Sequence, residues 1–224
     1  MTNEVQKALI TGASNGIGRF LTEKLLNEGI HVIAVTRSGE IENYSHPNLT
    51  VVQGDISDEA SINKAIEQIG QTSNQIDYLI NNAGVGPDLG DDVPTADHLK
   101  TSFSVNTTGT VLFTEGVLNY LKDGAHVVFL STAMALLRNA GPNGTAYRMS
   151  KAAINMYAVI LAQRLAVRGI RVTPLHPGWV QTRMGGENAP VTVEQSVTGI
   201  YQALTENTES GKFWNIEVEG LEEY

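Results

Sequence analysis

The sequence predicts an α/β fold in which helices cover both faces of a doubly wound parallel sheet. Short runs rich in β-branched and apolar residues alternate along the chain with longer segments of helical periodicity. A cluster of glycines stands where the first of these runs passes into the first helical segment, as a tight strand-to-helix turn requires. Because 224 residues suffice for one α/β unit with a large core, we expect a single domain, residues 1–224.

The elements follow from these patterns in chain order. Seven strands are predicted, at residues 5–10, 31–35, 49–53, 78–81, 126–131, 171–176 and 213–218. Helices are predicted at residues 16–28, 58–69, 95–121 with a break, 146–168 and 193–205. Gly29 and Gly169 each follow a helix, where a left-handed cap favours glycine. The irregular segments 84–94, 134–145 and 182–192 follow strands, at the sheet edge where open α/β sheets bind ligands.

Composition excludes several classes of function. A net charge of -9 argues against nucleic acid or an anionic membrane as a partner, because both require a basic surface. The absence of cysteine excludes disulfides, thiolate metal sites and a thiol nucleophile. No apolar run approaches the roughly 20 residues of a membrane span, and the first residues lack the pattern of an export leader. We therefore expect a cytoplasmic protein without a membrane partner.

The spacing of the metal-ligating side chains predicts no metal site. The histidines show no paired spacing, so we interpret them as structural or surface residues. They are His31, His46, His98, His126 and His176. Asp88, Asp91 and Asp92 form an acidic segment after the fourth strand, which we interpret as solvated surface charge rather than a cation site.

Tyr147 and Lys151 carry the first chemical signal. A helix brings residues four apart onto one face, so the Lys151 ammonium can lie near the Tyr147 phenol and favour its ionised form. A phenol tuned in this way can exchange a proton near neutral pH. The pair therefore predicts general acid-base chemistry.

The glycine cluster carries the second signal. Gly12, Gly16 and Gly18 mark a tight turn into a helix whose N-terminal amides can hold a pyrophosphate, with the Thr11 and Ser14 hydroxyls beside them. The alternative is that these glycines serve only the turn and close helix packing. A proton donor combined with a dinucleotide predicts hydride transfer to a carbonyl, or its reverse.

These motifs together resemble the short-chain dehydrogenase/reductase family over nearly the whole chain. The resemblance rests on the Gly-xxx-Gly-x-Gly spacing, residues 81–84 (Asn-Asn-Ala-Gly), Asn106, Tyr147-xxx-Lys151 and Pro177-Gly178. Residues 147–153 and 176–190 are similar, more narrowly, to the C-factor and sniffer-like carbonyl reductase branch. The resemblance implies a Rossmann fold, a nicotinamide dinucleotide and a tyrosine that protonates the substrate oxygen.

The resemblance also implies which residues form the site. Lys151 would bind the nicotinamide ribose, and Asn106 would hold a water that relays protons. Cofactor contacts are implied for Gly12, Ser14, Asn15, Gly16, Ile17, Gly18, Arg37, Asp55, Ile56, Asn82, Ala83, Gly84, Tyr147, Lys151, Pro177, Gly178, Val180 and Thr182. Two alternatives stay open, because Asn106 could simply break a helix and Asp55 could cap one.

Arg37 favours NADP(H) over NAD(H). A chain that prefers NAD places a carboxylate at the end of the second strand to bind the ribose hydroxyls, whereas this chain has Thr36 and Arg37 there. A guanidinium can pair with a 2′-phosphate that a carboxylate would repel. The alternative is that Arg37 is an ordinary solvated charge.

The hydroxyl that polarises the carbonyl is where the sequence departs from the family. The family serine stands thirteen residues before the tyrosine, where this chain has Met134. Ser131 and Thr132 end the fifth strand, so the serine aligns with Thr132 if the loop is two residues longer. We favour Thr132, with Ser131 as the alternative.

The sequence as a whole predicts an NADPH-dependent reductase of small aldehydes or ketones, with Tyr147 as the acid. The alternatives are an NAD-dependent alcohol dehydrogenase of the same family and a non-catalytic dinucleotide-binding sensor or signalling protein. The family resemblance also implies a homo-oligomer that pairs through residues 109–121 and 146–168.

Overall fold

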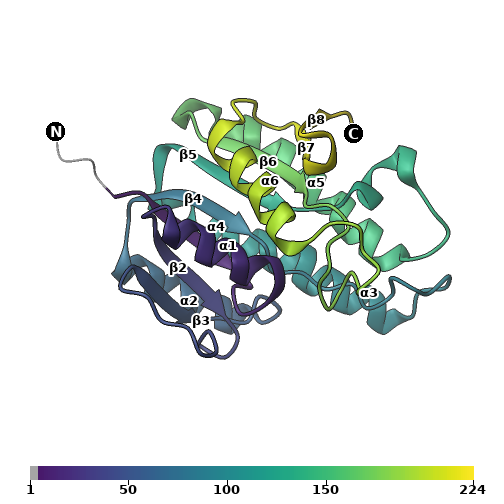
Figure 1. The fold of residues 1–224 in the computed structure, drawn as a ribbon, viewed down its shortest axis with the longest axis horizontal. Helices are drawn as coiled ribbons and strands as arrows, with labels where there is room; N and C mark the ends of the chain where they lie inside the picture. The colour runs from purple at the N-terminus through teal and green to yellow at the C-terminus, as the bar shows by residue number, and fades with distance from the viewer. Residues whose placement is uncertain (1–4) are drawn as a thin grey trace.

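Eight strands form one sheet in the order β3-β2-β1-β4-β5-β6-β7-β8 within residues 5–224, the part of the chain that this computed structural model describes (Figure 1). Their bounds are Lys7–Thr11 (β1), His31–Thr36 (β2), Leu49–Gln53 (β3), Ile76–Asn81 (β4), Leu121–Leu130 (β5), Arg171–His176 (β6), Phe213–Asn215 (β7) and Gly220–Glu222 (β8). All neighbouring strands are parallel except β7 and β8. The predicted doubly wound, single-domain Rossmann fold is confirmed. The expectation about an export leader concerned the first residues, of which 1–4 lie outside the described part.

Helices cover both faces of the sheet, as predicted. The α-helices are Gly16–Asn27 (α1), Glu59–Thr72 (α2), Ala96–Phe103 (α3), Thr110–Val117 (α4), Thr145–Leu165 (α5) and Val193–Glu206 (α6). One buried core joins the sheet to α2, α4 and α5, and a second joins it to α1 and α6. Figure 1 shows α1 and α6 on the near face.

The buried strands explain why the sheet forms. Helices cover both of its faces, so β1, β2 and β4 consist almost entirely of buried residues rather than alternating polar and apolar ones. Phe113 of α4 and Leu21 of α1 are each fully buried on opposite faces. Removing side chains of this kind leaves a cavity that costs about 2–5 kcal/mol.

The structure differs from the predicted elements at three places. The predicted break in the third helix is a π-helical segment, Ser104–Gly109, between α3 and α4. The fifth strand begins earlier, at Leu121, because a register shift against β4 extends the pairing. The predicted strand 213–218 ends at Asn215, after which a turn leads into the antiparallel strand β8. Gly29 (φ 79°) and Gly169 (φ 63°) adopt the predicted left-handed conformation.

Candidate active site

The turn from β1 into α1 leaves no room for side chains at two glycines. A Cβ on Gly12, whose φ is 69°, would lie 2.9 Å from Ala83 Cα. A Cβ on Gly18 would lie 2.3 Å from the Gly12 carbonyl oxygen. Asn15, the residue before α1, makes no side-chain cap. The first-turn amides of α1 are therefore free of a side-chain cap and can bind a phosphate.

A second turn, after β4, packs against this glycine turn. The Asn82 side-chain amide donates to the carbonyl oxygens of Thr11 (2.8 Å) and Gly12 (3.0 Å). The Thr11 hydroxyl in turn accepts from the backbone amides of Asn82 (3.2 Å) and Ala83 (3.1 Å). These four bonds fix the two turns side by side, at the carboxyl ends of adjacent strands.

One cleft brings together most of the residues that the sequence assigns to the cofactor. It is lined by Gly12, Ser14, Asn15, Gly16, Ile17, Gly18, Arg37, Asp55, Ile56, Asn82, Ala83, Gly84, Tyr147, Lys151, Pro177 and Thr182. Gly178 and Val180 do not line it. Val180 is buried and pairs with Val191 in an isolated bridge, so in the structure these two residues shape the loop after β6.

Asp55 and Arg37 lie at one end of this cleft. Asp55 accepts hydrogen bonds from the backbone amide (2.8 Å) and the hydroxyl (2.7 Å) of Ser57, whereas Asp58 caps α2. The alternative role of Asp55 as the helix cap is therefore wrong. Burial favours the neutral carboxyl, but the Ser57 hydrogen bonds and the Arg37 charge outweigh it and lower the pKa of Asp55.

Tyr147 and Lys151 lie at the other end, in the first two turns of α5. Burial raises the pKa of the Tyr147 phenol to about 12, although a hydrogen bond with Thr132 partly opposes the rise. Burial also lowers the pKa of Lys151 to about 8, and its ammonium donates to the Leu130 carbonyl oxygen at 2.6 Å. The expectation that Lys151 favours the ionised phenol is not met, because desolvation of both side chains dominates.

Asn106 lies in the π-helical segment and is buried. Its side chain bonds both backbone groups of Val85 at 2.8 Å and donates to the Ser150 hydroxyl at 3.0 Å. A Cβ on Gly84 would lie 3.2 Å from the Lys151 ammonium and 3.4 Å from the Asn106 side-chain oxygen. Asn106 thus lies within the break between α3 and α4, and its side-chain oxygen and the Lys151 ammonium both lie next to Gly84.

The two hydroxyls at the end of β5 have different partners. Ser131 donates to the Asn155 side-chain oxygen at 2.6 Å, in a buried pair. The Thr132 side chain lies close enough to the Tyr147 phenol to lower its pKa, and its hydroxyl accepts from the Met134 amide at 3.2 Å. Ser131 continues β5 and lines the cleft, whereas Thr132 does not line it. Thr132 is thus the hydroxyl beside the Tyr147 phenol and Ser131 the one on the cleft wall, so the assignment of Thr132 stays a prediction.

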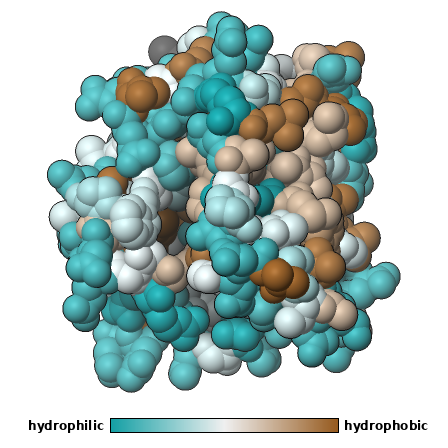
Figure 2. All heavy atoms as spheres, turned by 90° about the vertical axis from the view of Figure 1, so that its right-hand side faces the viewer, coloured by the Kyte–Doolittle hydropathy of each residue, from teal (hydrophilic) through white to brown (hydrophobic). Residues whose placement is uncertain are grey.

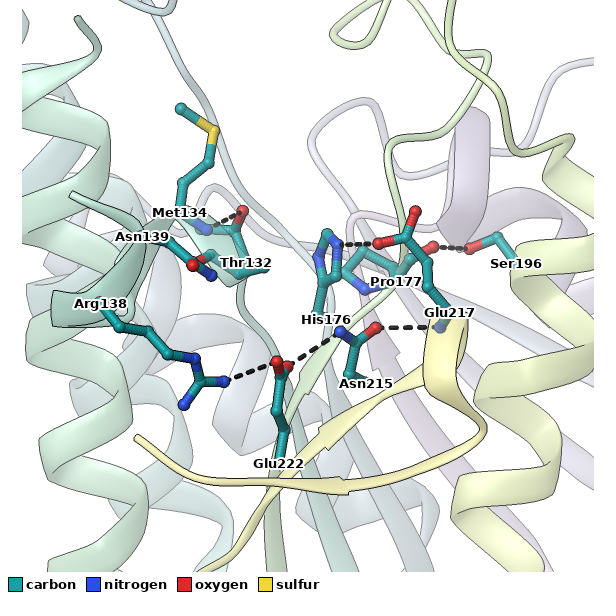
Figure 3. Close-up of polar contacts among 11 residues, drawn as sticks. Thr132, Met134, Arg138, Asn139, His176, Pro177, Ser196, Asn215, Glu217 and Glu222 are labelled. Carbon is teal, nitrogen blue, oxygen red and sulfur yellow. Dashed lines mark hydrogen bonds and ion pairs between the residues drawn. The ribbon is translucent and has the colours of Figure 1, made fainter. Parts of the chain in front are cut away.

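Polar contacts beyond the sheet edge hold the segment after Thr132 (Figure 3). Arg138 forms an ion pair with Glu222 of β8 at 2.6 Å, and Glu222 accepts from the Asn215 amide at 2.9 Å. Close by, a ring nitrogen of His176 lies 3.0 Å from a Glu217 carboxylate oxygen. The turn after β7 and strand β8 thereby join the end of β6 and the loop after β5.

Sequence reasoning missed several residues that line the cleft. They are Val35, Gly54, Ser57, Val85, Val105, Leu130 and Arg183. Most flank predicted residues at strand ends, so adjacency to the motifs was the available signal. Arg183 follows Thr182 directly, and a cation there could have been inferred from the need to hold phosphate on a chain of negative net charge.

Figure 2 shows the side of the molecule that lies to the right in Figure 1, with a hollow to the left of centre and hydrophobic residues gathered to the right. Among residues 5–224, no group of three or more potential metal-ligating side chains comes together. Within the same range, no helix is both long and apolar enough to cross a membrane.

Comparison with known sequences identifies the class of this site. A profile described as short chain dehydrogenase matches residues 6–191. Oxidoreductase UcpA of Salmonella typhimurium is 35% identical over 187 residues, which cover 79% of this chain and 70% of that protein. C-signal of Myxococcus xanthus is 40% identical over 148 residues, 62% of this chain and 88% of that protein.

Solved structures agree with the sequence relatives. The NADPH-bound carbonyl reductase from chicken fatty liver superposes with a TM-score of 0.88 at 29% identity, covering 99% of this chain and 95% of that one. Carbonyl reductase Sniffer of D. melanogaster superposes with a TM-score of 0.87 at 27% identity, covering 97% of this chain and 98% of that one. Fold and cleft thus define an oxidoreductase built on a Rossmann sheet. This chain belongs to the short-chain dehydrogenase family, and the predicted likeness to its C-factor and sniffer-like branch is confirmed.

Proposed function

We propose that this chain is an NADPH-dependent reductase of small aldehydes and ketones, in which Tyr147 protonates the substrate oxygen. The observation that carries the proposal is a single cleft running from the glycine turn at Gly12 to Tyr147 and Lys151. The acid and the phosphate-binding turn therefore face the same space. The chicken and Drosophila carbonyl reductases, similar over nearly the whole chain, support the same activity.

The residues present fit a dinucleotide. The glycine turn leaves no space for a Cβ at Gly12 or Gly18, and the uncapped start of α1 presents amides suited to a pyrophosphate. Asp55 and Ile56 would contact the adenine side, and Lys151 the nicotinamide ribose. When bound, the nicotinamide supplies the hydride that reaches the carbonyl carbon.

The side chains around Tyr147 would then complete the reduction. The phenol carries its proton at neutral pH, because its ordinary pKa already lies well above 7 and burial raises it further, to about 12, so Tyr147 has a proton to donate. The neighbouring Thr132 hydroxyl would donate to the same carbonyl oxygen and polarise it. Asn106 would hold a water that returns a proton to the site, beside Lys151.

The experiment that tests the activity follows the absorbance of NADPH and of NADH with a panel of small carbonyls. Tyr147→Phe should bind NADPH normally and lose turnover by about a hundredfold or more, because a positioned proton donor is removed. Reductase activity retained in Tyr147→Phe would contradict the assignment. Cofactor binding without turnover in the wild type would favour the non-catalytic alternative, and preferential alcohol oxidation with NAD would favour the dehydrogenase.

The cofactor preference for NADPH rests on Arg37. Arg37 lines the cleft and its charge acts on the Asp55 carboxylate, which supports a position beside the adenosine. Arg37→Ala should weaken the binding of NADPH by about 1–3 kcal/mol and leave the binding of NADH nearly unchanged, because only NADPH carries the 2′-phosphate.

Arg183→Ala is the matched control for this titration. Arg183 also lines the cleft but follows Thr182, whose side chain lies 3.5 Å from the position of a Cβ on Gly16. Arg183→Ala should therefore weaken the binding of NADPH and of NADH equally, because both cofactors carry the same pyrophosphate. If Arg37→Ala lowered the affinity for NADPH and for NADH equally, Arg37 would not recognise the 2′-phosphate.

We also propose that the chain acts in the cytoplasm as a homo-oligomer. A chain without cysteine suits a reducing compartment. Large apolar side chains are exposed on α4 and α5, the helices through which the family commonly pairs.

A further inference from the structure

Helix α5, which carries Tyr147, begins without a cap of its own. The preceding residue, Gly144, has a φ of 66° and offers no side chain to the free amides of the first turn. Tyr147 is the third residue of the helix, so its backbone amide is one of these free donors. A buried helix start of this kind needs acceptors from elsewhere in the chain.

Asp88 supplies these acceptors from the loop after β4. One carboxylate oxygen accepts from the Ala146 amide at 2.6 Å and the other from the Tyr147 amide at 3.1 Å. The Asp88 side chain is fully buried, so the sequence interpretation of Asp88 as solvated surface charge is wrong. A carboxylate at this position also complements the positive end of the helix. The neighbouring Asp91 and Asp92 are exposed, as expected.

Further contacts hold the same loop against Tyr147. Asn106 binds both backbone groups of Val85 at the start of the loop, and the Asp91 carbonyl oxygen accepts from the Gly144 amide at 3.1 Å. Between these points, a Cβ on Gly86 would lie 3.2 Å from a ring carbon of Tyr147. Residues 85–91 are therefore packed onto the start of α5 rather than free of it.

We propose that Asp88 is a positioning residue for Tyr147, binding the backbone of the first turn of α5 and so fixing the phenol relative to Thr132 and the substrate oxygen. The inference rests on the proposed function for its effect on turnover. It places a determinant of the acid's geometry on a loop 59 residues away in sequence. A displacement of about 1 Å at such a site can cost on the order of a hundredfold in rate.

The test uses Asp88→Asn and Asp88→Ser, with Asp92→Asn as the matched control because it makes the same charge change at an exposed position of the same loop. Hydrogen exchange of the Ala146 and Tyr147 amides should accelerate about tenfold or more in Asp88→Asn, since one acceptor is replaced by a donor. Turnover should fall by about ten to a hundredfold, with the NADPH dissociation constant changed by less than about threefold. Asp88→Ser, like Asp88→Asn, keeps one acceptor but brings no fixed N–H donor against the two amides, so it should recover part of both losses, and Asp92→Asn should behave as the wild type.

A double variant separates positioning from general damage. If Asp88 acts through the phenol, adding Asp88→Asn to Tyr147→Phe should lower the residual turnover by less than about twofold. Equal losses in both backgrounds, or unchanged exchange at Ala146 and Tyr147, would overturn the proposal. A wild type that reduces no carbonyl would contradict the proposed function instead, and the exchange measurement would still decide whether Asp88 holds Tyr147.

Discussion

At the scale of single residues, the partners of Ser131 and Thr132 decide which hydroxyl can act on a substrate. The Ser131 hydroxyl donates a hydrogen bond to the Asn155 side-chain oxygen inside the protein, and breaking that buried bond would leave a polar group without a partner. Thr132 instead lies beside the Tyr147 phenol and lowers its pKa. A carbonyl oxygen that accepts from Tyr147 would therefore lie within reach of Thr132.

Substitution of the two hydroxyls tests this difference. Thr132→Val keeps the shape and removes the donor, so kcat/KM for the carbonyl should fall about ten to a thousandfold with NADPH affinity preserved. Ser131→Ala should cost less catalysis and act mainly on stability, because its bond is internal. Steady-state kinetics of both variants provide the measurement. A severe loss of kcat/KM confined to Ser131→Ala would reverse the assignment. If neither substitution changed kcat/KM, Tyr147 would be left as the only group that polarises the carbonyl.

Residue chemistry was predictable where it depends on short spacing. Tyr147 and Lys151 are four apart on one helix, and the glycine turn spans seven residues, so sequence alone placed them. The pKa of Tyr147 was not predictable, because it depends on how completely the loops bury the phenol. Asp88 was misread for the same reason, since its partners follow 58 and 59 residues later.

At the scale of elements, buried strands and capped helices agreed best with the sequence. Thr192 and Gln195 form a capping box at the start of α6, a local signal that the sequence displays directly. The π-helical segment was expected only as a break, because its buried Asn106 is bonded to Val85, 21 residues earlier in the chain, and no local pattern displays that contact. Such segments are frequent at functional sites.

The C-terminal strand pair is an element that the sequence did not predict. Glu219, with a φ of 51°, makes the turn into β8 in a conformation that favours glycine, so no residue signal marked it. What stabilises the turn is tertiary, namely the pairing of β8 with β7 and the ion pair between Glu222 and Arg138 (Figure 3). Through Arg138, this strand pair supports the loop that follows Thr132.

At the scale of the whole molecule, strand order explains how distant motifs meet. The order in which strands are added to the sheet reverses between β1 and β4. These two strands are parallel neighbours, although β2 and β3 separate them in sequence. The glycine turn and the Asn82 turn therefore lie together at this switch point, where open α/β sheets bind ligands. The same edge receives the loops after β5 and β6 (Figure 1), so one cleft collects residues from the connections that follow six strands, β1 to β6.

The exposed apolar side chains of α5 carry the last prediction, which concerns assembly. Met149, Met156 and Ile160 recur at intervals of seven and four, so they lie on one face of the helix, and Leu112 of α4 is exposed as well. A second copy would cover this face in an isologous pair, in which each substitution occurs twice. Met156→Lys should therefore shift a wild-type dimer or tetramer toward monomer in sedimentation velocity, because unpaired buried charges cost several kcal/mol. Val218→Lys is the control, since Val218 is exposed to a similar degree (60% against 62% for Met156) but lies after β7. A wild type that sediments as a monomer, or equal effects of the two lysines, would show that the α5 face is not the interface.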